Sequence, residues 1–104
     1  MHWPARFKAE ISVRATEDGG RKSPIFTGYR PGFWLHHRMY QGMRAYSDAT
    51  IELIDGDSMA PGDSGSAILR PHLPEDWSEL AVGDSVEFYE GPYLIGIARI
   101  TATL

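Results

Sequence analysis

The sequence predicts an all-β fold, either a β-sandwich or a small β-barrel. Two observations support this prediction: apolar and polar residues alternate along several short segments, and glycine and proline residues separate those segments. The chain has 104 residues, including 11 glycines and 7 prolines. This length fits one domain, residues 1–104, with room for one modest hydrophobic core.

The first predicted strand, residues 7–13, shows the alternation most clearly. Its odd-numbered residues are apolar, and its even-numbered residues are charged or polar. The odd-numbered side chains should face the core, because a shift of one residue would bury Lys8 and Glu10 instead. Further strands are expected at residues 25–29, 33–37, 50–53, 66–70, 85–89 and 94–104.

Two segments do not follow the strand pattern. Residues 38–49 show no clear period, and we predict a long loop there. Residues 74–80 are the best candidate for a helix, of one or two turns at most. Gly28 precedes Arg30 and Pro31, and we expect it where a strand bends or another backbone comes close.

The composition excludes several classes of protein. Cysteine is absent, which rules out a disulfide scaffold and a thiolate zinc site. No apolar run is long enough to cross a membrane, and the first residues lack the apolar core of a secretion signal. We therefore expect a cytoplasmic protein with no membrane partner.

The charges are distributed unevenly along the chain. Residues 1–44 carry eight basic and three acidic side chains, whereas residues 45–104 carry two basic and eleven acidic ones, for a net charge of −4. A basic face toward an anionic partner is compatible with this polarity. The alternative is that folding mixes the two halves over the surface.

Motifs of catalysis and cofactor binding are weak or absent. Gly62-Asp63-Ser64-Gly65 is similar to the nucleophile segment of trypsin-like proteases, but that fold needs roughly twice this length, and the segment also fits an ordinary turn. His36 and His37 are neighbours on a predicted strand, so they point to opposite faces and cannot easily share a metal ion. No glycine-rich phosphate loop is present. We predict no catalytic residue, no metal, no cofactor and no nucleotide bound by this chain alone.

Three stretches together resemble the C-terminal domain of translation elongation factor Tu. The resemblance covers nearly the whole chain, and it implies that family's closed Greek-key antiparallel β-barrel of six to seven strands. The GTPase domain and second barrel of the factor have no counterpart in these 104 residues. The matching residues are Phe7–Ile11, Glu17–Phe33, Thr50–Leu53, Met59–Asp63, Gly91 and Ile95–Ala98.

The resemblance implies a role in binding the T-stem of a tRNA, or a similar structured RNA. Arg21 lies at the position of a family arginine that contacts the tRNA backbone, and Arg70 lies where some members are basic. We expect these two arginines to approach each other and form one basic face. The full set expected to contact RNA is Arg21, Lys22, Arg30, Arg70, Glu90 and Gly91.

Departures from the family pattern leave a second interpretation open. Gly32 replaces a family glutamine, and Pro92-Tyr93 replaces a glycine-arginine pair. The chain could instead be a protein-interaction module that mimics or displaces the factor's domain on a GTPase, ribosomal or toxin partner. Its added surface would be Met39, Tyr40, Met43 and Tyr46. A third possibility is that the chain has no partner of its own.

Overall fold

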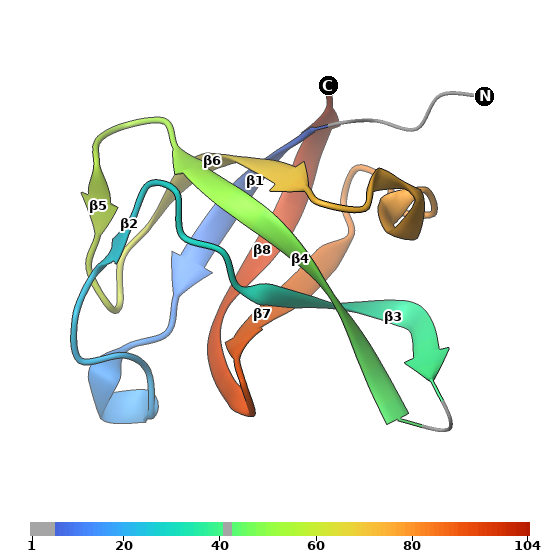
Figure 1. Ribbon diagram of the computed structural model, residues 1–104. Helices are drawn as coiled ribbons and strands as arrows, with labels where there is room; N and C mark the ends of the chain where they lie inside the picture. The colour runs from blue at the N-terminus through green and yellow to red at the C-terminus, as the bar shows by residue number, and fades with distance from the viewer. Residues whose placement is uncertain (1–5, 41–42) are drawn as a thin grey trace.

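The strands close into an antiparallel barrel, as the sequence predicts (Figure 1). The computed structural model describes residues 6–40 and 43–104, with the backbone alone described for 36–40 and 43–44. Around the barrel the order is β1-β6-β4-β3-β7-β8, so strands consecutive in sequence are often not neighbours. The barrel strands are β1 (Phe7–Val13), β3 (Gly32–Tyr40), β4 (Met43–Leu53), β6 (Ser64–Pro71), β7 (Ser85–Glu90) and β8 (Tyr93–Thr103).

Short elements lie outside the barrel wall. Strands β2 (Ile25–Phe26) and β5 (Ser58–Met59) form a separate two-stranded sheet. Two single 3₁₀ turns, η1 (Thr16–Asp18) and η2 (Pro74–Trp77), complete the described chain. In this part of the chain no helix has the length or the apolar character needed to cross a membrane.

The core is filled by the residues that the alternation selects. Phe7, Ala9, Ile11 and Val13 are at most 3% exposed, whereas Lys8 is exposed to solvent. Each large side chain buried in this way contributes roughly 1.5–3 kcal/mol to folding. The predicted orientation of the first strand is therefore confirmed.

The turn η2 packs its buried Trp77 into the core. The Trp77 ring lies 5.6 Å from the ring of Phe7 and 5.1 Å from that of Phe33, measured between centroids. Its indole Nε1 donates a 3.1 Å hydrogen bond to Ser47 Oγ, which in turn donates to Asp76. The short helix predicted at residues 74–80 thus exists as one turn, and its tryptophan is part of the core.

The prediction of a long loop at residues 38–49 is wrong. Strands β3 and β4 continue through most of this segment and pair as a hairpin, with Tyr40 opposite Met43 and Trp34 opposite Tyr46. The register shifts between Trp34 and Met39, and such an irregularity hides the period of two from a reading of the sequence. Figure 1 shows the hairpin extending from the lower right of the barrel.

Strand β8 comes unusually close to both of its neighbours at Gly96. A Cβ atom placed there would lie 2.4 Å from the Phe88 ring and 2.4 Å from the Ser12 carbonyl oxygen. Only a residue without a side chain fits such an approach. Gly96 therefore allows β1, β8 and β7 to form one continuous wall.

Candidate functional site

Arg21 is positioned by the turn that follows β1. Glu17 and Asp18 form the 3₁₀ turn η1, and Gly19 ends it in the left-handed region with a φ of 98°. The Thr16 hydroxyl then donates a 2.5 Å hydrogen bond to the Arg21 carbonyl oxygen. The backbone at Arg21 is thus fixed from the same turn that ends the first strand.

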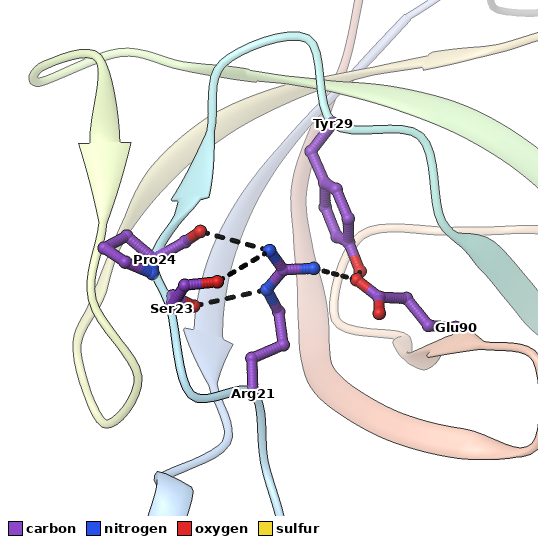
Figure 2. Close-up of polar contacts among 5 residues, drawn as sticks. All are labelled: Arg21, Ser23, Pro24, Tyr29 and Glu90. Atoms are coloured by element: carbon purple, nitrogen blue, oxygen red, sulfur yellow. Dashed lines mark hydrogen bonds and ion pairs between the residues drawn. The ribbon is translucent and has the colours of Figure 1, made fainter.

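The guanidinium of Arg21 is engaged at all three of its nitrogens (Figure 2). Its Nε donates to the Ser23 carbonyl oxygen at 3.2 Å, and its Nη2 donates to Ser23 Oγ at 3.2 Å and to the Pro24 carbonyl oxygen at 3.4 Å. Its Nη1 forms a charge-assisted hydrogen bond with Glu90. With the side chain 23% exposed, little of this arginine faces an external ligand.

Tyr29 completes the group of side chains that we call the Arg21 cluster: Arg21, Tyr29 and Glu90. The Arg21 Cζ lies 5.2 Å from the centre of the Tyr29 ring, within the range of a cation–π contact. The Tyr29 hydroxyl donates to the same Glu90 oxygen that Arg21 binds. Burial, reinforced by that carboxylate, raises the pKa of Tyr29 well above its ordinary value.

Arg70 does not join this cluster. It lies near the end of β6, next to Leu69, which pairs with Phe7 at the start of β1. Arg21 follows the opposite end of β1, and a strand of this length spans roughly 20 Å. Figure 1 likewise shows the loop after η1 at the left and the end of β6 pointing right. The expected approach of the two arginines into one basic face is therefore wrong.

Arg70 has a carboxylate partner of its own. Its Nε forms an ion pair with Glu52 on the neighbouring strand β4. Both side chains are well exposed, so this pair is screened by water. The two arginines at family positions thus each face a glutamate of the same chain.

The remaining residues expected to contact RNA are at the surface. Lys22 follows Arg21 and Arg30 follows Tyr29, and both are exposed, as is Gly91. Gly91 lies in the tight connection between β7 and β8, with a φ of 54°. Among the described side chains, neither Lys22 nor Arg30 forms an ion pair. Their role in binding RNA stays a prediction.

The aromatic residues of the β3–β4 hairpin are partly described. Tyr46 is 42% exposed and packs edge to face against Tyr89, with ring centroids 5.3 Å apart. A Cβ at Gly32 would lie 3.3 Å from the Cβ of Tyr46, so glycine at this position gives the tyrosine room. Met39, Tyr40 and Met43 belong to the two strands, but their side chains lie outside the described part of the structure.

The structure describes the protease-like motif at the start of β6, whereas the side chains of His36 and His37 lie outside its described part. Ser64 begins β6 at the surface, and the described histidine side chain, that of His72, lies 3.0 Å from Thr50 Oγ1 through its Nε2. Within the described residues, no group of three or more histidine and carboxylate side chains could hold a metal ion. The absence of catalytic activity itself stays a prediction.

The closed barrel places the chain in the class of small all-β domains. The family model of the elongation factor Tu C-terminal domain matches residues 2–72. The chain therefore belongs to that family. The match ends before η2, so β7, which ends at Glu90, and β8 lie beyond it.

Sequence reasoning missed the partners of the two arginines. Glu90 is among the residues expected to contact RNA, whereas its carboxylate binds Arg21 and Tyr29. Arg21 and Glu90 are separated by 69 positions, and no local pattern links residues so far apart. Glu52 and Tyr29 had no distinguishing signal beyond their residue types.

Proposed function

We propose that this chain is a non-catalytic binding module of the translation-factor type whose partner is a protein. The observation that carries the proposal is the pairing of both family-position arginines with glutamates, Arg21 with Glu90 and Arg70 with Glu52. A phosphate group would have to displace a carboxylate at each of these arginines. Phosphate contacts supply most of the affinity in nucleic-acid binding, so this arrangement favours a protein partner.

Two exposed tyrosines support the same proposal. Tyr46 is exposed and packs edge to face against Tyr89, and Tyr93 is exposed beside the Arg21 cluster. Exposed tyrosines are typical anchors of protein interfaces, since they bury a large area at low conformational cost. The proposed partner is translation-related, a GTPase or a ribosomal protein being the classes that the family suggests.

A titration with fluorescently labelled tRNA at low salt tests this proposal. We expect no saturable binding of tRNA by the wild-type protein. The variants Glu90→Gln and Glu52→Gln remove the carboxylates that compete with phosphate, so they should bind tRNA more tightly than the wild type does. Capture of a partner from cell extract should persist after nuclease treatment. Saturable tRNA binding by the wild-type protein would overturn the proposal.

Binding of structured RNA is the second candidate function, and the exposure of Lys22 and Arg30 favours it. These two cations flank the Arg21 cluster in sequence and face solvent. If they contact phosphates, the double variant Lys22→Ala with Arg30→Ala should lower the salt dependence of tRNA binding by roughly 1–2 units in log–log slope. An unchanged slope would exclude these residues as the RNA contacts.

A further inference from the structure

A groove of about 320 Å³ lies on the outside of the barrel wall, beside the turn that follows β1. Its apolar lining comes from Val13, Leu94, Gly96 and Ile97. Charged side chains of Arg14, Asp18 and Glu87 complete it, whereas Arg21, Tyr29 and Glu90 do not line it. The groove is therefore separate from the Arg21 cluster.

Ile97 is the apolar side chain that the groove presents to solvent. It lies on β8 opposite Ser12 of β1 and opposite Glu87 of β7, so both of its cross-strand neighbours are polar. It is 43% exposed, although the residues on either side of it, Gly96 and Ala98, are buried. A β-branched aliphatic residue in this outward position contributes little to the core and is available to a partner.

The charges on the two sides of the groove differ, because Arg14 follows β1 and Glu87 lies on β7, with β8 between the two strands. The guanidinium of Arg14 lies 3.3–3.5 Å from the position of a Cβ on Gly19, so its positive charge rests on the η1 turn beside Asp18. The Glu87 carboxylate on the β7 side accepts a 3.0 Å hydrogen bond from the Tyr89 hydroxyl. Among the described side chains, Glu87 has no cationic partner. The β7 side of the groove is therefore negative and matches a basic group.

From this arrangement we propose that the groove binds a short segment of a protein partner that carries an aliphatic side chain next to a lysine or arginine. The aliphatic side chain packs against Ile97 and Leu94, and the basic side chain lies beside Glu87. The volume of the groove suits one or two such side chains. Two carboxylates in the lining disfavour a phosphate backbone, so a nucleic acid is not the expected occupant. This inference rests on the proposed function, because it names the partner's chemistry.

Two model peptides test the groove directly. The probes are acetyl-Lys-Leu-Lys-amide and its acidic counterpart acetyl-Glu-Leu-Glu-amide, each titrated into the isotope-labelled full chain and followed through backbone amide resonances. We expect the basic peptide to shift the amides of Ser12, Gly96 and Ile97 saturably, and the acidic peptide to bind at least about tenfold more weakly.

Three variants make the test specific. Ile97→Ser should weaken binding of the basic peptide about tenfold, since the exposed apolar contact is lost. Glu87→Gln should bring the two peptides to within about twofold of each other. The matched control is Val82→Ser, which removes a 62% exposed aliphatic side chain outside the groove and should leave binding unchanged.

The inference is overturned if the basic peptide gives no saturable shifts, if the shifts lie outside the groove, or if both peptides bind equally to the wild-type protein. These outcomes leave the proposed protein partner intact, because that proposal is decided by the tRNA titration. Conversely, tRNA binding at the Arg21 cluster would overturn the proposed function while the peptide titration still reports on the groove.

Discussion

The wall around Gly96 and the Arg21 cluster hold the same barrel together by different means. At Gly96 the strands β1, β8 and β7 approach so closely that no side chain fits between them. In the Arg21 cluster a guanidinium, a tyrosine and a carboxylate join the loop after η1 to the end of β7. The first region depends on steric fit, which tolerates almost no change, and the second on polar contacts that water can partly replace.

The largest effect is expected at Gly96. Changing Gly96→Ala places a Cβ against the Phe88 ring and the Ser12 carbonyl oxygen, both at 2.4 Å. Because one of these contacts is backbone, the wall itself must move, at a cost of roughly 3 kcal/mol. Urea unfolding measures this loss. A urea midpoint equal to that of the wild type would show that the strands around Gly96 can accommodate a Cβ atom without cost.

The Arg21 cluster should be the next most sensitive region. Changing Glu90→Ala leaves a half-buried guanidinium and the Tyr29 hydroxyl without their shared acceptor. We expect a loss of about 1–3 kcal/mol in the free energy of unfolding. The matched control is Glu52→Ala, which removes a more exposed pair and should cost less. Equal losses for the two variants would contradict the distinction between them.

Gly28 is a useful contrast to Gly96, because its backbone conformation, and not a lack of space, requires a glycine. It has a φ of 94°, and nothing lies within 4 Å of the position of a Cβ. The expected cost of Gly28→Val is therefore backbone strain alone, about 1–2 kcal/mol, with no overpacking. Thermal unfolding measures it. An unchanged melting temperature would show that the left-handed conformation is not required there.

The raised pKa of Tyr29 predicts a dependence on pH at the alkaline end. The folded state disfavours the phenolate, whereas the unfolded chain ionises near pH 10. The stability contributed by the neutral hydroxyl is fully present below about pH 10 and is lost as the pH rises above it. Urea midpoints between pH 8 and 11 should fall further for the wild type than for Tyr29→Phe. Parallel curves would mean that Tyr29 does not titrate differently on unfolding.

The smallest effect is expected at Arg70. Its ion pair with Glu52 is exposed on both sides, so Arg70→Ala should change the free energy of unfolding by about 0–1 kcal/mol. The same measurement on Arg21→Ala should give a clearly larger loss. If Arg70→Ala proves the more damaging of the two, the Arg21 cluster is not the principal polar contact of the barrel.

The hairpin of β3 and β4 shows how local irregularity limits prediction from sequence. The alternation in Phe7–Val13 is unbroken, and both its strand and its buried face are as predicted. The register shift between Trp34 and Met39 breaks the period of two, so the neighbouring segment was predicted to be a loop. The pairing of β3 with β4 makes this segment a hairpin, and that pairing cannot be read from the local sequence.

By itself, the sequence determined the all-β class, the core face of β1 and the likeness to the elongation factor Tu C-terminal domain. These follow from local alternation, residue type and an extended match along the chain. Only the tertiary structure decided that Arg21 meets Glu90, that Arg70 meets Glu52, and that Ile97 faces an open groove. Strand order and register bring together residues that lie tens of positions apart in the sequence. A local sequence pattern contains no information on which of these distant residues meet.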